Sequence, residues 1–474
     1  MSAAMRLCEA ASAVGGEVVG AAGEECSFSG VSTDTRTLGA GELFIALRGE
    51  HFDGNDYVGT AVERGAAAAL VASDAVCAVK GAGLPLIAVG DTRDALGRLA
   101  AHWRAKFSIP VVAVTGSNGK TTTKEMIAAI LRAAWGGAVH STEGNLNNEI
   151  GLPLTLLGLD ATHRAAVVEI GMSHPGEVLE LARIAQPSVA LVTNAQRAHL
   201  EGLGSLEAVA AEKGALYAGM PESGVAVINA DDAFYELWLG LASGRKLVRF
   251  SFERPVEVCA RRVCDGLNAS ESVPTVLTLR FGGEEVEVRL TMPGIHNARN
   301  ALGAAAAALA AGAPLRAVRD GLSAFRGVRR RLTRRRAMNG ATLYDDTYNA
   351  NPDSVRAGID VLATADGKKI LVFGDMGEVG DDGARLHEEV GAYAREKGVD
   401  LLFALGASSA RAVRGFGGGG RHFDEADALV NALKAELSPR VTVLVKGSRF
   451  MRMERVADAV AAPDAASYLN SGES

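Results

Sequence analysis

The sequence has few cysteines, few aromatic residues and no long apolar run. Its 474 residues include five scattered cysteines without a CxxC pair, which are Cys8, Cys26, Cys77, Cys259 and Cys264. This odd number and spacing argue against a zinc site or a disulfide framework and favour reduced thiols in the cytoplasm. No apolar stretch reaches 18 residues without a charge, and the N-terminus lacks a basic region followed by an apolar run. We therefore expect neither a secretory leader nor insertion into a membrane.

An excess of positive charge is also missing. Lysine and arginine total 49 against 56 aspartates and glutamates, and the formal net charge is −7. A broadly basic surface for nucleic acid is therefore not expected. The seven arginines at positions 326–336 are a local exception, and the neighbouring aromatic residue is Phe325. Because stacking aromatics are sparse there, we interpret most of these arginines as a solvated basic face.

Apolar residues make up 48% of the chain, enough for several cores, and the length suggests about three domains. Short apolar runs separated by helical spacing indicate parallel strands covered on both faces. In the middle of the chain we expect strands at 109–114, 165–170, 189–193 and 225–229, and helices at 205–220 and 301–313. In the last part we expect strands at 369–373, 400–405 and 441–445, helices at 382–397 and 425–437, and a flexible loop at 415–420.

These patterns predict an α/β protein with three domains. The first hundred residues mix short elements, among them an expected strand at 42–47 and an expected helix at 57–69. We predict a small α/β domain over residues 1–107, a central domain with a mostly parallel sheet over 108–328, and a Rossmann-like domain over 329–474.

A phosphate loop follows the first strand of the central domain. Residues 115–122 read TGSNGKTT and connect an apolar strand to a helix with an apolar face. Glycines let backbone amides close around phosphate oxygens, and the helix N-terminus adds its dipole. Lys120 supplies a charge for the terminal phosphates, and the Thr121 hydroxyl can hold Mg²⁺. Valine at position 114 excludes the longer Walker spacing, and these residues do not choose between ATP and GTP.

Two further polar residues follow neighbouring strands. Glu169 ends one apolar strand, and His199 follows the end of the next. In an open α/β sheet, ligands lie outside the carboxyl ends of the strands, so Glu169 is expected to face the phosphate loop and to hold Mg²⁺. His199 is either a polar surface residue or a second metal ligand at the same edge.

Lys213 lies on an otherwise apolar helical stripe with Val209, Leu216 and Tyr217. Its ammonium group either extends from the edge of the stripe into water or is buried for a chemical reason. Burial lowers the pKa of an amine and leaves a neutral nucleophile, which can react with CO₂ to give a carbamate. Such a carbamate would be an anionic ligand for a second Mg²⁺.

The order of these motifs resembles that of the Mur ligase family of peptidoglycan synthesis. The central matches are TGSNGKTT, VVEIG, TNAQRAHLEG, AEKG and PGIHNARN, and the later ones are DDTYNANP, VFGDM and VKGSR. In the first domain, STDTR at 32–36, FIALRG at 44–49 and FDG at 52–54 are similar to UDP-sugar-binding motifs of the family. The resemblance covers essentially the whole chain.

The resemblance implies roles for the matched residues. It implies that Lys120, His199, Lys213 and Arg331 are catalytic, with Thr121 and Glu169 on a first Mg²⁺ and His199 and carbamylated Lys213 on a second. The implied ATP-binding residues are Gly116, Ser117, Asn118, Gly119, Lys120, Thr121, Thr122, Asn300 and Asp346. The implied substrate-binding residues are Ser32, Asp34, Arg36, Asn55, Tyr348, Asn349, Asn351, Lys446, Ser448 and Arg449.

The implied reaction joins UDP-N-acetylmuramoyl-tripeptide to D-alanyl-D-alanine at the expense of ATP, through an acyl phosphate, in a cytoplasmic monomer. A relative that adds diaminopimelate or lysine usually carries a DNPR motif, which does not occur in this sequence. Folate polyglutamylation is a weaker alternative because the first domain resembles a UDP-sugar-binding one. A nucleic-acid-stimulated ATPase that uses the arginines of 326–336 is the competing hypothesis from another class.

Overall fold

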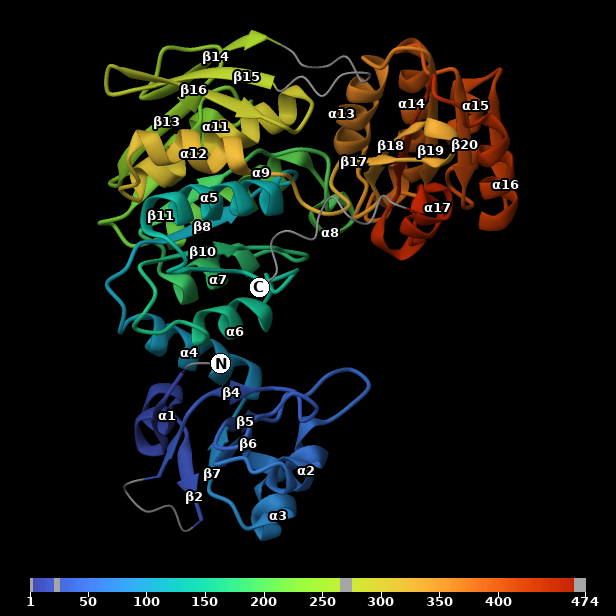
Figure 1. Ribbon diagram of the computed structural model, residues 1–474. Helices are drawn as coiled ribbons and strands as arrows, with labels where there is room; N and C mark the ends of the chain where they lie inside the picture. Colours follow the sequence, from blue (N-terminus) through green and yellow to red (C-terminus); the bar gives the residue numbers. More distant parts are fainter. Residues whose placement is uncertain (1–2, 21–25, 265–274, 464–474) are drawn as a thin grey trace.

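The computed structural model describes residues 3–20, 26–264 and 275–463, which form three sheet-based parts in chain order (Figure 1). The N-terminal part lies at the bottom of that view, the central part above it, and the C-terminal part at the upper right. Within the described residues, no helix is both long enough and apolar enough to cross a membrane.

The N-terminal part is built on a five-stranded sheet that is parallel except for β2. In spatial order the strands are β2 (Glu17–Val19), β7 (Leu86–Val89), β6 (Ala68–Ala72), β5 (Leu43–Ile45) and β4 (Val31–Ser32). A small sheet pairs β1 (Met5–Arg6) with β3 (Ser27–Phe28), and the helices are α1 (Leu7–Val14), α2 (Val58–Glu63), α3 (Val76–Val79) and α4 (Thr92–Arg104).

The central sheet has nine strands, and the phosphate-loop strand β8 lies inside it. In spatial order they are β16 (Glu284–Leu290), β15 (Thr275–Phe281), β14 (Val258–Cys264), β13 (Lys246–Ser251), β12 (Val225–Asn229), β11 (Val189–Val192), β8 (Val111–Thr115), β10 (Ala165–Glu169) and β9 (Val139–Ser141). The strands from β9 to β14 are parallel, and β15 and β16 extend the edge as an antiparallel hairpin.

Helices cover both faces of this central sheet. Val112 and Val114 of β8 pack on one face, beneath α5 (Lys120–Trp135), α11 (Ile295–Ala310) and α12 (Leu315–Ala324). Val111 and Ala113 face the other side, which is covered by α6 (Gly151–Leu157), α7 (Glu177–Ala185), α9 (Leu206–Gly219) and α10 (Tyr235–Leu241). This alternation is that of a strand buried on both faces.

The C-terminal part is a six-stranded sheet, parallel except for its edge strand β17. In spatial order the strands are β17 (Thr333–Arg336), β18 (Thr342–Asp346), β22 (Val441–Lys446), β19 (Lys368–Gly374), β20 (Leu401–Leu405) and β21 (Gly420–Phe423). One face carries α13 (Pro352–Ala363), α14 (Gly383–Glu396) and α15 (Ala410–Phe416), and the other carries α16 (Ala426–Glu436) and α17 (Glu454–Val460).

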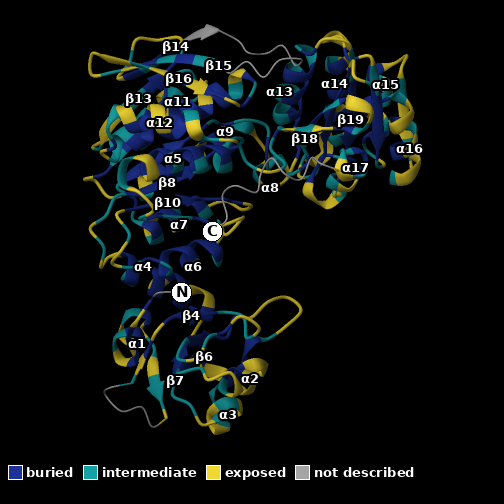
Figure 2. Cartoon of the chain, in the orientation of Figure 1, coloured by how far each residue is buried: buried dark blue, intermediate teal, exposed yellow. Residues whose placement is uncertain are grey.

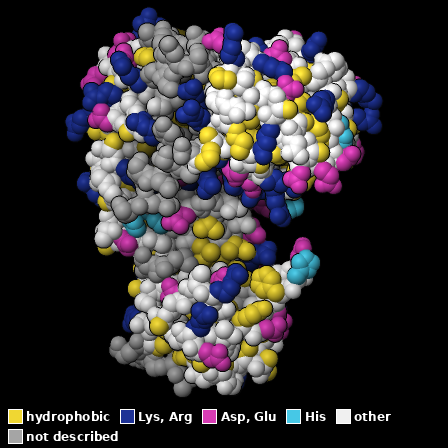
Figure 3. All heavy atoms as spheres, turned by 45° about the vertical axis from the view of Figure 1, so that its right-hand side comes forward, with side chains coloured by type: hydrophobic (Ala, Val, Ile, Leu, Met, Phe, Trp, Pro, Cys, Tyr) yellow, Lys and Arg dark blue, Asp and Glu magenta, His cyan; other side chains and the backbone are white. Residues whose placement is uncertain are grey.

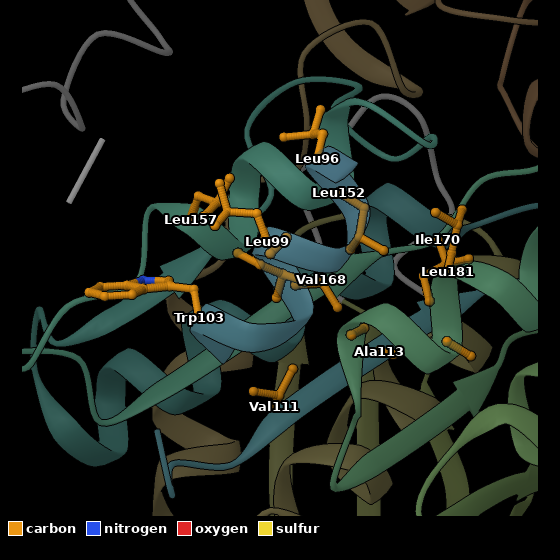
Figure 4. Packing of buried hydrophobic residues seen from close by; sticks show 14 of the residues in the cluster. Leu96, Leu99, Trp103, Val111, Ala113, Leu152, Leu157, Val168, Ile170 and Leu181 are labelled. Atoms are coloured by element: carbon orange, nitrogen blue, oxygen red, sulfur yellow. The ribbon is translucent and has the colours of Figure 1, made fainter. Parts of the chain in front are cut away.

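The N-terminal and central parts share one hydrophobic core. Leu96, Leu99 and Trp103 of α4 pack against Leu152 of α6 and Val168 of β10 (Figure 4). As far as the chain is described, the apolar clusters of the C-terminal part contain residues of that part alone. Figure 2 shows the buried strands of each sheet and the exposed outer faces of the surrounding helices.

The expected strands and helices of the central and C-terminal parts are present, with ends that differ by one or two residues in most cases. The expected helix at 57–69 is wrong in its second half, because α2 ends at Glu63 and Ala68–Ala72 form β6. Burial between two neighbouring strands overrides the helical preference of these alanines. The expected loop at 415–420 is also shorter, since α15 runs to Phe416 and β21 begins at Gly420. The alanine-rich helix α11 ends at Ala310, so Ala311–Ala313 lie outside it.

Candidate active site

A cleft of about 1640 Å³ lies at the carboxyl ends of the central strands, between the central and C-terminal parts. Its walls include the phosphate loop, Glu169, His199, Asn300 and Arg331. Figure 3 shows open space between the C-terminal part above and the N-terminal part below. The cleft therefore brings together residues that the sequence separates by more than two hundred positions.

Two glycines give the phosphate loop its shape. Gly116 has a φ of 145°, and a Cβ there would lie 1.9 Å from Thr193 Oγ1. Gly119 has a φ of 81°, and a Cβ there would lie 2.3 Å from Asn300 Oδ1. Residues with a side chain rarely adopt these φ values, and neither position has room for a Cβ atom.

Asn194, which follows the neighbouring strand β11, holds the phosphate loop in place. The Ser117 amide donates to the Asn194 carbonyl at 3.0 Å, and the Asn118 amide donates to Asn194 Oδ1 at 3.0 Å. These two amides are therefore engaged within the protein. The first-turn amides of α5, from Lys120 onward, have no carbonyl of their own helix to bind and are the donors suited to phosphate oxygens.

Lys120 lies over the same loop. Its Nζ donates to the Gly116 carbonyl at 2.8 Å. Loss of hydration lowers its pKa, and the negative charges of Glu169 and Glu378 oppose that shift. The ammonium group is thus held where the terminal phosphates of a nucleotide would meet it.

Glu169 is a buried carboxylate whose two oxygens differ in their surroundings. Its side chain is 2% exposed. Oε1 accepts a hydrogen bond from Asn147 Nδ2 at 2.7 Å, whereas Oε2 is buried and has no hydrogen-bond partner within residues 3–20, 26–264 and 275–463. A buried, unsatisfied carboxylate oxygen is costly, and a bound cation would satisfy it.

Lys213 on α9 is fully buried, with an exposed fraction of 0%. Its Nζ has no hydrogen-bond partner among the residues that the structure describes. Burial places its pKa well below the ordinary value, and the nearby Lys120 charge lowers the pKa further. This position excludes the interpretation in which the lysine extends into water. Burial therefore favours the neutral amine over the ammonium form at this position.

His199 caps the short helix α8 (Leu200–Leu203) with a left-handed backbone at φ 57°. Its Nδ1 lies 2.8 Å from Oε2 of Glu378, which belongs to the C-terminal part. The Glu378 carboxylate has a lowered pKa, chiefly because of the hydrogen bond with His199. Sequence reasoning did not identify Glu378, although it lies two residues beyond the VFGDM motif.

The donors fit a hydrated cation that also binds phosphate. Among the described residues, no three His, Cys, Asp or Glu side chains come close enough to hold a metal by themselves. Thr121, Glu169 and His199 nevertheless line one wall of the cleft. Mg²⁺ usually keeps several waters and takes one or two protein oxygens together with substrate phosphates, which is the arrangement that these donors allow.

Arg331 is the arginine of the 326–336 run that lines the cleft. Its Nη2 donates to the Thr121 hydroxyl at 2.9 Å, and its guanidinium stacks on the Tyr348 ring at 4.1 Å. Arg335 instead pairs with Asp345 and Asp458. Arg331 is thus the arginine of this run that both lines the cleft and contacts the phosphate loop.

The other expected residues of the C-terminal part fall into two groups. Lys446 pairs with Asp346 at 2.6 Å and donates to the Asn349 carbonyl at 3.0 Å, inside the cleft. Asn351 caps α13 and exchanges side-chain hydrogen bonds with Asn118 at 2.8 and 3.2 Å. By contrast, Ser448 is buried and binds the Gly377 amide and the Ala350 carbonyl, and Arg449 pairs with Glu454 on the surface.

The four expected residues of the N-terminal part lie outside this cleft. Arg36 forms a bidentate pair with Asp34, whose backbone is held by the Ser32 hydroxyl. Asn55 is 6% exposed, and its amide donates to Asp53 and accepts from the Ala72 amide. Their role as ligands of the UDP group remains a prediction.

Profiles of a single family match the three parts in order. The Mur ligase family catalytic-domain profile matches residues 27–104, the Mur ligase middle-domain profile 114–308, and the Mur ligase glutamate ligase domain profile 330–449. The UDP-N-acetylmuramoyl-tripeptide--D-alanyl-D-alanine ligase of Escherichia coli (strain K12) is 40% identical over 92% of this chain and 95% of its own length. The chain belongs to the Mur ligase family.

Solved Mur ligases share its architecture. MurF from Acinetobacter baumannii is 32% identical and superposes with a TM-score of 0.88 over 96% of this chain and 98% of that one. MurF ligase from Thermotoga maritima, solved in complex with ADP, is 26% identical with a TM-score of 0.78 over 91% and 96% of the two chains. This Mur ligase therefore has the α/β, three-domain fold that the sequence predicts.

Proposed function

We propose that this Mur ligase forms an amide bond between UDP-N-acetylmuramoyl-tripeptide and D-alanyl-D-alanine, driven by ATP. One observation in the structure carries the proposal. In the part of the chain that the structure describes, a buried oxygen of Glu169 and the buried amine of Lys213 lack hydrogen-bond partners, and both lie in the same central part as a phosphate loop. Polar groups buried without partners are rare unless a ligand or a modification completes them. The relative that is 40% identical bears the name of this reaction.

The parts of the chain divide the work. Residues 1–107 bind the UDP-muramyl group, 108–328 bind ATP, and 329–474 bring D-alanyl-D-alanine. The boundaries at 107 and 328 fall between α4 and β8 and between α12 and β17. The cleft lies where the last two parts meet, which suits a reaction that needs ATP and an incoming amine together.

In the first step, an oxygen of the tripeptide carboxylate attacks the γ-phosphorus of ATP, and ADP leaves. First-turn amides of α5 orient the phosphates, and Lys120 and Arg331 offset the charge that develops on the transferred group. Bound Mg²⁺ would neutralise further charge there; Thr121 and Glu169 are the residues that would hold a first ion, and His199 and carbamylated Lys213 those that would hold a second. Asn300, beside Gly119, lies near enough to the phosphate loop to contact the nucleotide.

Lys213 contributes as a carbamate. Its neutral amine attacks CO₂, the N–C bond forms, and one proton is released, which leaves an anionic group on a buried side chain. That group supplies the negative charge that the donor set needs for a second cation.

In the second step, the amine of D-alanyl-D-alanine attacks the acyl phosphate and phosphate leaves from the tetrahedral intermediate. Lys446, Asn349 and Tyr348 line the side of the cleft from which the amine would enter. Because an acyl phosphate hydrolyses readily, contacts that close the C-terminal part over the cleft protect the intermediate from water.

The test is phosphate release from Mg-ATP by the purified chain with UDP-N-acetylmuramoyl-tripeptide and either D-alanyl-D-alanine or diaminopimelate. We expect release that depends on both the tripeptide and D-alanyl-D-alanine, with one new UDP-pentapeptide. Release with diaminopimelate and a muramyl dipeptide substrate would instead favour the relative that adds diaminopimelate or lysine. Release that needs no muramyl peptide and rises with added nucleic acid would favour the ATPase hypothesis instead.

A further inference from the structure

Glu378 and His199 meet across the boundary between the central and C-terminal parts. Glu378 follows β19 in the C-terminal part, and its Oε2 lies 2.8 Å from His199 Nδ1. The backbones also touch, since the Glu201 amide donates to the Glu378 carbonyl at 3.4 Å. The contact therefore fixes both the side chain of Glu378 and the loop that carries it.

Both residues have an unusual backbone conformation. His199 has a φ of 57° and Glu378 a φ of 59°, in the left-handed region that residues with side chains seldom adopt. Such conformations persist where the surrounding structure imposes them, and they concentrate at functional sites. Here the two residues with this conformation contact each other through their side chains.

The hydrogen bond determines which nitrogen of His199 is available. A carboxylate can only accept, so Nδ1 must carry the proton that is shared with Glu378. In the neutral ring, the lone pair is then on Nε2. A histidine that binds a metal typically donates its other N–H to a carboxylate, which fixes the tautomer and the ring orientation.

Glu378 also faces the positive charges of the cleft. The positive charges of Lys120 and Lys213 lower the pKa of the Glu378 carboxylate. The negative charge of Glu378 in turn raises the pKa of each lysine, against the effect of burial. Each of these partners belongs to the central part, whereas Glu378 belongs to the C-terminal part. The C-terminal part thus places a carboxylate beside His199, Lys120 and Lys213, which all belong to the central part.

We propose that Glu378 is a positioning residue for the cation site, supplied by the C-terminal part, which holds the His199 ring with Nε2 free for a divalent cation. The cation site is then complete only when the C-terminal part is docked. This inference rests on the proposed function, because the cation is the one that accompanies ATP.

Two measurements test the proposal on the full chain. The first is Mn²⁺ binding in the presence of ADP, followed by the electron paramagnetic resonance signal of free Mn²⁺. Glu378→Ala should weaken Mn²⁺ binding by about 10–100-fold, the range typical of lost carboxylate–histidine contacts. Glu378→Gln should lose less, because its amide oxygen can still accept from Nδ1. Glu201→Gln, an exposed neighbour on the same contact, is the matched control and should bind Mn²⁺ like the wild type.

The second measurement needs neither metal nor turnover. With ¹⁵N-labelled histidine, the ring nitrogens of His199 should report the Nδ1–H tautomer in the wild type and a loss of that preference in Glu378→Ala. If Glu378→Ala leaves both the tautomer and the Mn²⁺ affinity unchanged, the proposal is wrong. If Glu378→Ala does not fold, the same two readouts on Glu378→Gln decide, since its shape is preserved.

Failure of the proposed function has a different signature. A wild-type chain that makes no UDP-pentapeptide refutes the ligase, whatever the Mn²⁺ titrations give. A wild-type chain that makes the pentapeptide, together with a Glu378→Ala variant of unchanged Mn²⁺ affinity and unchanged His199 tautomer, refutes only the role of Glu378.

Discussion

Arg197 of the central part binds Asp353 of the C-terminal part through both its backbone amide and its guanidinium group. The amide donates to Asp353 Oδ2 at 2.8 Å, and Nη2 lies 2.6 Å from Oδ1. Nη1 also reaches Glu389 at 2.9 Å. The hydrogen bond to Asp353 is the main reason that the pKa of Arg197 is raised, although burial opposes the shift. Arg197 lies two residues before His199, so this ion pair and the Glu378 contact close the same boundary.

Replacing Arg197 with alanine should loosen the docking of the C-terminal part. Truncating one partner of a desolvated charge pair costs about 2–5 kcal/mol, and this pair is only partly buried, so we expect the lower end. The KM for D-alanyl-D-alanine should rise more than the KM for ATP, and small-angle scattering should show a larger radius of gyration. Arg414→Ala is a suitable control, because its pair with Glu388 is exposed. Equal scattering for Arg197→Ala and Arg414→Ala would contradict the prediction.

Lys120→Ala should lower turnover sharply without unfolding the chain. The ammonium group contacts loop carbonyls rather than a core cluster, and the transition state loses one of its charge partners. Loss of one such group typically lowers kcat by about 10²–10³-fold. Phosphate release and the thermal unfolding midpoint should be measured on the same preparation. Normal turnover in a folded variant would refute the phosphate-loop assignment.

Activity should depend on CO₂ if Lys213 is carbamylated. Rigorous removal of CO₂ at mildly acidic pH should lower turnover, because the carbamate breaks down to the amine. Native mass spectrometry should then show the loss of one CO₂. Lys124 provides an internal comparison, since it is equally buried but its Nζ donates to the Thr142 carbonyl and pairs with Glu125. An unmodified Lys213 in a fully active preparation would count against the carbamate.

Because of His387, the free energy of unfolding should decrease as the pH is lowered from neutral. His387 is fully buried, its Nδ1 donates to the Gly383 carbonyl at 2.6 Å, and its Nε2 accepts from the Met376 amide at 2.9 Å. Burial lowers its pKa. Below the ordinary histidine value of about 6.5, the unfolded chain takes up a proton that the folded chain refuses, so stability falls until the folded pKa is reached.

The contribution of one such proton is at most about 1.4 kcal/mol per pH unit. His387→Gln keeps a donor and an acceptor but does not titrate, so its unfolding free energy should fall less steeply between pH 7 and pH 5. His140 also has a pKa lowered by burial and will leave a residual slope in the variant. Denaturant unfolding at several pH values measures both slopes, and parallel curves would exclude His387 as the source.

The sequence reveals the buried parallel strands because they are continuous apolar runs. It does not reveal β13–β16 in the same way, since β15 and β16 alternate buried and exposed positions and carry several charged residues. The phosphate loop, Glu169 and Lys213 follow from local pattern, namely a glycine turn, a strand end and one lysine on an apolar stripe. For Lys213, the pattern leaves both burial and extension into water open, and tertiary packing decides.

The contacts between parts have no local signal. Asn118 and Asn351 lie 233 positions apart, and the pairing of His199 with Glu378 likewise depends on how two separate sheets dock. Asn194, which holds two amides of the phosphate loop, lies in a matched motif but gives no sign of that task. Such residues become visible only when the carboxyl ends of the strands are placed around one cleft.

The core shared by the N-terminal and central parts bears on how the chain matures during synthesis. That core includes residues from Ala3 to Ala242, so the apolar face of α4 stays uncovered until its partners on α6 and α7 have been translated. The described buried residues of the two C-terminal clusters all lie between Leu332 and Val460. A fragment that is released from the ribosome and ends near residue 107 should therefore expose the apolar face of α4 and aggregate readily. The last third of the chain can form its hydrophobic cores on its own.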